Sequence, residues 1–184
     1  VTLKEALMFN KASTKEALLN FKCFIPKKCE NITEVKDVEI FLRQKAIENE
    51  YLDKTATYLF FNDENNFVLD GYFSLAIKAF EFCDEVSKTK RKKFSIDHDK
   101  EAKAVPGFLI GQLGRAAHTP SGTGQIILNA VISQIQAIKE LIGGCRLVYL
   151  DCLDCIKDYY IKQGFNFVQK NPNNSKYNQM YIVI

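Results

Sequence analysis

Apolar residues recur along the chain at two spacings, which predict helices in some stretches and strands in others. Spacings of three and four residues predict helices over residues 3–19, 35–49, 124–142 and 151–163. Runs rich in β-branched and aromatic residues predict strands over residues 21–25, 55–61, 67–77, 105–113, 146–150, 165–168 and 179–184. Strand and helix alternate in the second half. We therefore expect an α/β protein in which the 105–113 and 146–150 strands run parallel.

Two of the predicted strands form a hairpin. Residues 55–61 and 67–77 are separated by Asn62 to Asn66, a cluster of turn-forming residues. Gly71 interrupts the second strand. A glycine inside a strand is typical of a bulge or of a close approach by another backbone segment.

A strand, a glycine-containing loop and a helix follow one another between Val105 and Asn129. The first amides of a helix have no partner inside it, and the helix dipole adds partial positive charge there, so this arrangement suits a phosphate group. The loop Gly122-Thr123-Gly124-Gln125 lacks the G-K-[ST] ending of a P-loop. It also lacks the last glycine of a dinucleotide-binding G-x-G-x-x-G, because position 127 is isoleucine.

Length and composition narrow the class of protein. The chain has 184 residues, of which 47% are hydrophobic and 26% charged, and these values suit a single globular domain. A net charge of +3 gives no strongly basic footprint over the whole chain. The sequence has neither an apolar run near the roughly 20 residues of a membrane span nor an apolar signal core at its start, so we expect a cytoplasmic protein.

Residues 83–104 differ from the rest of the chain because they are rich in charge. The run Lys88 to Lys93 (K-T-K-R-K-K) is basic and is followed by Phe94. We interpret this stretch as a basic excursion from the domain that is solvated and mobile, because short runs of like charge usually are. The alternative is a contact surface for RNA or for an acidic partner protein.

The six cysteines are interpreted as reduced thiols rather than a disulfide framework. Cys152 and Cys155 have CxxC spacing, but a zinc site needs two further ligands. The sequence offers no second CxxC and only two histidines. We therefore expect no metal.

The second half of the chain resembles the GNAT superfamily of acetyl-CoA-dependent N-acetyltransferases in two motifs. Ser121-Gly122-Thr123-Gly124 is similar to the Q/R-x-x-G-x-G/A loop that binds pyrophosphate in that superfamily. Tyr159 to Phe165 (Y-Y-I-K-Q-G-F), about thirty-five residues downstream, is similar to its F-Y-x-x-x-G-F segment. The resemblance implies a mostly antiparallel mixed sheet, with one parallel strand pair splayed around the cofactor and helices flanking it.

The first half resembles the branch of that superfamily that contains toxin-type acetyltransferases. The similar segments are Asp37 to Leu42, Thr57 to Leu59 and Gly71 to Ala76, so the resemblance covers residues 21–184 apart from the basic excursion. Members of the branch acetylate the amino group of aminoacyl-tRNA and are often encoded beside a DNA-binding antitoxin. The resemblance therefore implies aminoacyl-tRNA or a protein amine as acceptor. The basic run Lys88–Lys93, which the resemblance does not cover, would then help to bind tRNA. The resemblance also implies an antitoxin partner and leaves a homodimer open.

The resemblance assigns roles to eight residues of this chain. Main-chain groups of Leu113 and Arg115 would bind the pantetheine arm of acetyl-CoA. Tyr160 matches the tyrosine that acts as general acid toward the coenzyme A thiolate, and a phenol with a pKa of about 10 is protonated at neutral pH. The alternative for Tyr160 is a core aromatic. The residues whose amides would meet the pyrophosphate are Ser121, Gly122, Thr123, Gly124 and Gln125.

One position departs from the loop motif. Thr119 stands three places before Gly122, where the family usually has glutamine or arginine, and Pro120 follows it. The change removes one supporting side chain and leaves the backbone amides in place. A non-catalytic module that binds acetyl-CoA or a partner on the same fold is therefore the alternative to an enzyme.

A general base is not identified from the sequence. Candidates of the right type are Glu39, Asp70, His118 and Asp151. His118 stands out because it lies in the loop beside the expected thioester, and its ordinary pKa of about 6.5 suits the task. An α-amino group of aminoacyl-tRNA has a lowered pKa and needs no dedicated base.

Overall fold

The computed structural model describes residues 1–29, 33–61, 67–95 and 97–184. It divides into two compact units, each built from two stretches of chain. Unit 1 contains residues 1–76 and 111–131, and unit 2 contains residues 77–110 and 132–184. The expectation that all 184 residues act as one domain stays a prediction.

The described strands form a six-stranded mixed sheet in the order β1-β2-β3-β4-β6-β5. β3 and β4 are parallel, whereas the β1–β2, β4–β6 and β5–β6 pairs are antiparallel. The predicted α/β class and the predicted parallel pair are therefore confirmed. The strands are β1 (Ala56–Phe61), β2 (Leu69–Glu81), β3 (Ala104–Arg115), β4 (Leu147–Leu153), β5 (Asn166–Lys170) and β6 (Tyr177–Val183).

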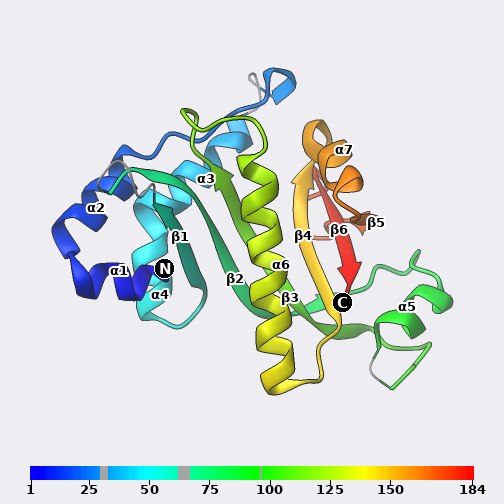
Figure 1. Cartoon of the computed structure of the whole chain (residues 1–184). Coiled ribbons are helices and arrows are strands. Elements are labelled where there is room, and N and C mark those ends of the chain that lie inside the picture. The colour runs from blue at the N-terminus through cyan, green and yellow to red at the C-terminus, as the bar shows by residue number, and fades with distance from the viewer. Residues whose placement is uncertain (30–32, 62–66, 96) are drawn as a thin grey trace. The chain divides into compact units, whose positions relative to one another are not determined.

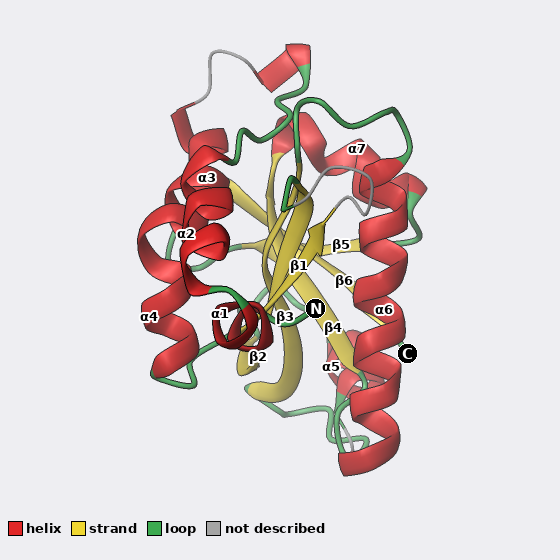
Figure 2. Ribbon diagram, turned by 60° about the vertical axis from the view of Figure 1, so that its left-hand side comes forward, coloured by secondary structure: helices red, strands yellow, loops and turns green. Residues whose placement is uncertain are grey.

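Unit 1 packs a cluster of short helices against the β1–β2 hairpin (Figure 2). Buried Leu3, Leu18, Leu42, Leu59 and Tyr72 join these elements into one hydrophobic cluster. The helical elements are α1 (Leu3–Phe9), α2 (Lys11–Asn20), η1 (Lys27–Cys29), η2 (Thr33–Lys36), α3 (Asp37–Ile40), the π-helical turn η3 (Phe41–Lys45) and α4 (Ala46–Tyr51).

Two predicted helices of unit 1 are divided in the structure. The 3–19 helix breaks at Asn10, whose extended backbone ends α1 and whose side chain accepts a hydrogen bond from the Ser13 amide at the start of α2. The 35–49 helix is interrupted by η3, where the backbone winds as a π-helix. The apolar spacing predicts where these helical stretches lie, but it does not reveal such local changes in winding.

The predicted hairpin is confirmed, with β1 antiparallel to β2. The predicted Asn62–Asn66 turn lies outside the described residues. Phe60 pairs with Gly71 and the next residue, Phe61, pairs with Leu69, so Asp70 is the extra residue of a β-bulge. Gly71 also meets another segment closely, because a Cβ built on it would lie 2.7 Å from the Gly114 carbonyl oxygen. Both readings of this glycine are therefore confirmed.

Unit 2 contains the β4, β5 and β6 strands together with α7 (Asp154–Lys162), which packs on all three (Figure 1). The predicted 151–163 helix begins only at Asp154, because residues 151–153 continue β4 and pair with β6 as far as Leu153 and Tyr177. Helix α6 (Thr123–Ile142) starts in unit 1 and ends in unit 2, followed by Gly143 and Gly144 with positive φ angles.

The basic excursion is not simply solvated, which corrects that expectation. It contains α5 (Lys88–Phe94), and Phe94 is buried at 2% exposure. The Phe94 ring stacks on Phe82 at 5.8 Å and meets Tyr181 edge-on at 4.6 Å. The charge pattern predicted a solvated run because it gives no weight to one aromatic residue that anchors the helix.

The expectation of reduced thiols holds for Cys23, Cys83, Cys145 and Cys152, which are free. Over the described ranges there is neither a group of three or more potential metal ligands nor a helix long and apolar enough to cross a bilayer.

Candidate functional site

The end of β3 is bound along its backbone by the segment Lys22 to Phe24. The Phe24 amide donates to the Arg115 carbonyl at 2.9 Å, Cys23 and Ala116 form an isolated bridge, and the Ala117 amide donates to the Lys22 carbonyl at 2.8 Å. The Arg115 carbonyl, expected to bind pantetheine, thus already accepts one bond. A carbonyl can accept a second, so the main-chain roles of Leu113 and Arg115 stay predictions.

The loop between β3 and α6 leads directly into the start of the helix (Figure 1), and it leaves backbone amides free there. Gly122 has a φ of +98°, a conformation that favours glycine and turns the chain into α6. Within the part of the chain that the structure describes, the Ser121, Gly122 and Gly124 amides have no protein acceptor. Three free amides at the positive end of a 20-residue helix suit an anion.

Two other amides of the predicted set are engaged. The Gln125 amide donates to the Gly122 carbonyl at 2.9 Å, and the Thr123 amide donates to the Pro120 carbonyl at a longer 3.4 Å. The Thr123 hydroxyl also donates to Pro120, at 3.0 Å. An anion at this loop would therefore meet mainly Ser121, Gly122 and Gly124.

Thr119 supports the loop from inside. It is buried at 8% exposure, and its hydroxyl donates to the Ala116 carbonyl at 2.7 Å. Arg115 Nη1 donates to the Thr119 carbonyl at 2.9 Å and to its hydroxyl at 3.2 Å. The Arg115 guanidinium also lies over the Phe24 ring, with Cζ 3.6 Å from the ring centroid. Thr119, the residue that departs from the loop motif, is thus bonded to Ala116 and Arg115 and supports the loop through these bonds.

His118, in the same loop, is paired with Asp70. Its Nε2 lies 2.9 Å from Asp70 Oδ1, and the Ala116 amide donates to the Asp70 carbonyl at 2.7 Å. The bulge at Asp70 directs this carboxylate toward the loop. Two of the four general-base candidates therefore form one ion pair when the imidazole is protonated.

A cavity of about 590 Å³ opens beside this pair within unit 1. Its wall mixes apolar rings with polar and charged groups. The lining residues are Ser13, Glu16, Ala17, Asn20, Phe21, Lys22, Phe67, Val68, Leu69, Ala116, Ala117 and His118.

The other two base candidates hold backbone or loop structure. Glu39 accepts from the Cys23 amide at 2.8 Å and pairs with Arg43 at 2.9 Å. Burial, reinforced by the nearby Glu39, raises the pKa of the Cys23 thiol to about 12, so this thiol is not a nucleophile at neutral pH. Asp151 accepts from the Asn171 side chain at 2.8 Å, and burial raises the pKa of its carboxyl.

Tyr160 lies in unit 2, on α7, and is buried at 7% exposure. Its ring meets Tyr159 edge-on at 5.2 Å and Phe165 at 5.8 Å. These contacts fit the core-aromatic alternative, and a general acid would need only its hydroxyl to reach the thiolate. The role of Tyr160 stays a prediction.

Helix α5 presents lysines while its arginine faces inward. Arg91 donates to the carbonyls of Val86, Cys83 and Ala102 and lies over the Phe82 ring. The exposed Lys88 pairs with Glu101, and Lys93 lies over Tyr181 at 5.9 Å. Lys92 is exposed as well.

Sequence reasoning missed Phe24, and it gave Thr119 and the Arg115 side chain no supporting role. The sequence carries a partial signal for the Arg115–Thr119 contact, because an arginine side chain can reach a threonine that lies four residues later in a turn. The partner Phe24 lies about ninety residues away in the chain and carries no such signal.

The chain was compared with known proteins. It matches no protein-family model, and no curated protein matches its sequence. Solved structures with a similar fold include a bacterial toxin, with a TM-score of 0.69 and 17% identity over 91% of this chain and 83% of the other.

Two further similar structures show the AtaT toxin with ligands. AtaT complexed with acetyl-methionyl-tRNAfMet has a TM-score of 0.65 and 17% identity, covering 88% of this chain and 85% of that one. An AtaT tyrosine-to-phenylalanine mutant bound to acetyl-CoA and the C-terminus of the antitoxin AtaR has a TM-score of 0.60 and 14% identity, covering 90% and 84%. At these identities the likeness is one of fold, and it confirms the expected fold class.

Proposed function

We propose that this protein is an N-acetyltransferase that uses acetyl-CoA and acts on aminoacyl-tRNA. The observation that carries the proposal is the set of three free amides at the start of α6, on a fold shared with toxins solved with acetyl-CoA or with an acetylated tRNA. By the same likeness we propose an antitoxin as partner.

In the proposed reaction the chain supplies binding and proton transfer. The Ser121, Gly122 and Gly124 amides hold the diphosphate, and main-chain groups of Leu113 and Arg115 hold the pantetheine arm. The acceptor nitrogen forms a bond to the thioester carbonyl carbon, and the carbon–sulfur bond breaks. Tyr160 donates its proton to the departing sulfur. The proton lost by the amine passes to solvent, and solvent returns a proton to the Tyr160 phenolate.

Acetyl-CoA binding is the first test. Titration calorimetry with the wild-type protein should show saturable binding. Gly124→Val should abolish it, because a branched side chain would occupy the space beside the free amides. Absence of heat with folded wild-type protein at saturating ligand would refute the proposal.

The role of Tyr160 separates an enzyme from a binding module. Burial of Tyr160 among Tyr159 and Phe165 is the observation that favours the second candidate, a non-catalytic module that binds acetyl-CoA or a partner. Tyr160→Phe keeps the ring and removes the hydroxyl. If acetyl transfer falls steeply while acetyl-CoA binding persists, Tyr160 is the acid. An unchanged rate assigns it to the core, and a wild-type protein that binds without transfer supports the module.

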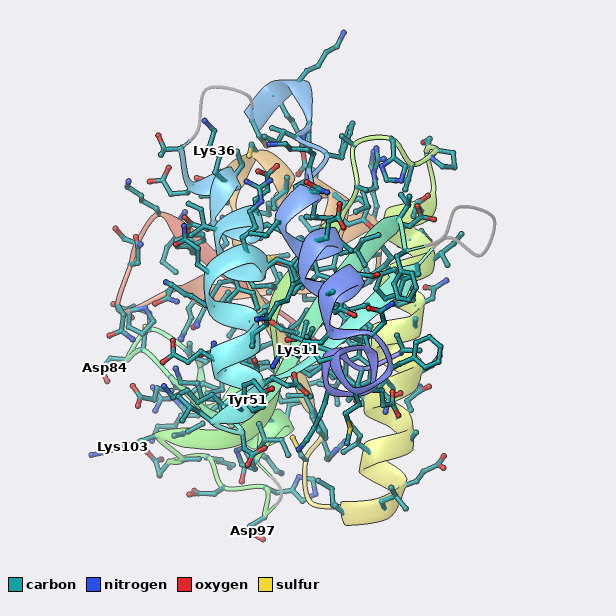
Figure 3. The ribbon with its side chains drawn as sticks, turned by 90° about the vertical axis from the view of Figure 1, so that its left-hand side faces the viewer. Lys11, Lys36, Tyr51, Asp84, Asp97 and Lys103 are labelled. Carbon is teal, nitrogen blue, oxygen red and sulfur yellow. The ribbon has the colours of Figure 1, made fainter. Side chains whose placement is uncertain are left out.

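The acceptor is tested through α5. We propose that its exposed lysines contact tRNA, because phosphate contacts by lysine dominate such binding. A Lys92→Glu and Lys93→Glu double variant should weaken tRNA binding and reduce its salt dependence. Lys11→Glu and Lys36→Glu, at exposed sites of α2 and η2, form the matched control (Figure 3). Equal losses in both pairs would contradict a role for α5.

Mass spectrometry of tRNA and protein after incubation with labelled acetyl-CoA identifies the acceptor.

A further inference from the structure

The Arg115 side chain links three parts of unit 1. It lies at the end of β3, and its guanidinium stacks on Phe24 of the Lys22–Phe24 segment. It also donates to Thr119 in the loop before α6. The sequence pointed only to the main chain of this residue. The side-chain contacts give it a separate task.

Arg115 supplies the charged donor to the Thr119 carbonyl, while the Thr119 amide and hydroxyl both donate to the Ala116 carbonyl, at 3.3 and 2.7 Å. Over the described residues, the only hydrogen bond accepted by the Thr119 carbonyl comes from Arg115 Nη1, at 2.9 Å. Thr119 precedes Pro120, which has no amide hydrogen to donate. The next residues, Ser121 and Gly122, carry the free amides. Loss of the guanidinium would therefore leave the Thr119 carbonyl without its donor, directly before the residues that carry those amides.

The guanidinium is itself fixed in place. Its flat face covers the Phe24 ring, which is 40% exposed, and its Nη1 edge faces Thr119. A planar cation with donors in a fixed fork can stack and donate at once, which lysine cannot do. Charge-assisted hydrogen bonds are also stronger than neutral ones.

We propose that Arg115 is a positioning residue that holds the loop open for the diphosphate of acetyl-CoA, in place of the polar side chain usual three residues before the first loop glycine. The inference rests on the proposed function. It assigns Arg115 no contact with the reacting atoms. Removal of its side chain should therefore raise the KM for acetyl-CoA and leave kcat unchanged.

The test compares two acetyl donors. Acetyl-pantetheine carries the thioester and lacks the diphosphate, so its use does not depend on the loop. For Arg115→Gln we expect KM for acetyl-CoA to rise about tenfold, consistent with the loss of charged hydrogen bonds. The kcat/KM for acetyl-pantetheine should fall much less than that for acetyl-CoA, because the substitution keeps the Arg115 main-chain groups expected to bind the pantetheine arm. Arg115→Lys should rescue only part of the loss, because it keeps the charge and loses the fork.

A second variant keeps the proposal testable if Arg115→Gln unfolds. Thr119→Val removes the hydroxyl bonds to Ala116 and Arg115 and should raise KM for acetyl-CoA, whereas Thr119→Ser should not. Equal losses with both donors, or an unchanged KM in Arg115→Gln, would overturn the proposal. Wild-type protein that fails to bind acetyl-CoA by calorimetry would instead refute the proposed function.

Discussion

The addition of one methyl group at Gly71 should destabilise the protein measurably. A Cβ at this position would lie 2.3 Å from Ile127 Cδ1 and 2.7 Å from the Gly114 carbonyl oxygen, and both distances are shorter than real Cβ contacts. The Ile127 methyl ends a side chain that can change rotamer, although it is buried at 1% exposure. The carbonyl belongs to β3 and can move only with its strand.

Two opposing effects set the size of the expected change in the free energy of unfolding of Gly71→Ala. Overpacking of a core costs about 1–3 kcal/mol. Alanine also restricts the unfolded chain relative to glycine, which offsets about 0.4–1 kcal/mol. We therefore expect Gly71→Ala to lower the free energy of unfolding by about 1–2 kcal/mol. Ile127→Val alone should cost about 0.5–1.5 kcal/mol through the lost methylene.

Combining the two substitutions tests the cause. Valine at position 127 lacks the Cδ1 atom. The double variant therefore keeps the clash with the Gly114 carbonyl and loses the clash with the Cδ1 atom. Its cost should be smaller than the sum of the single costs by about 0.5 kcal/mol or more. Urea unfolding curves give each value. Gly111→Ala is the matched control on β3, since its Cβ would come no closer than 3.2 Å to Ser74 Oγ. Additive costs, or a Gly71→Ala cost equal to that of the control, would refute the close-approach reasoning.

Three further outcomes follow from features of the two units. Phe94→Ala should lower the free energy of unfolding by about 3–5 kcal/mol because the ring is fully packed, and a urea curve matching wild type would show α5 to be loosely attached. Hydrogen bonds from Asn178 and Lys170 lower the pKa of Asp154, so its contribution to stability is present above about pH 4 and is lost as the pH falls through the lowered value. Asp154→Asn should therefore flatten the acid limb of a thermal-stability profile, and an unchanged limb would contradict this. Gly122→Ala, strained at φ +98° but free of contacts, should weaken acetyl-CoA binding several-fold in calorimetry and lower the melting temperature by only a few degrees. Wild-type affinity in that variant would show that the loop tolerates the change.

The sequence predicted the β3–α6–β4 framework because its signals are local and strong. The apolar face of α6 repeats over 20 residues, Gly143 ends it, and the flanking strands are compact apolar runs. The position of Gly122 at the turn into α6 was predicted for the same reason, since its conformation requires glycine.

The remaining features depend on contacts between distant residues. The break at Asn10 and the π-helical turn at 41–45 leave the apolar spacing intact. The packing of Phe94 depends on Phe82 and Tyr181, and the support of Thr119 depends on an arginine stacked on Phe24. No local pattern in the sequence brings such partners together.

The division of each unit into two stretches of chain has a consequence for synthesis on the ribosome. Residues 1–76 cannot complete unit 1 until the chain has been made as far as Val131, and unit 2 needs the last residues of β6. A nascent chain must therefore hold the β2 edge without its later partner β3 while the next 50 or so residues emerge. We expect little protection from protease on stalled chains that end before residue 111 and a sharp rise in protection once residue 131 has cleared the tunnel.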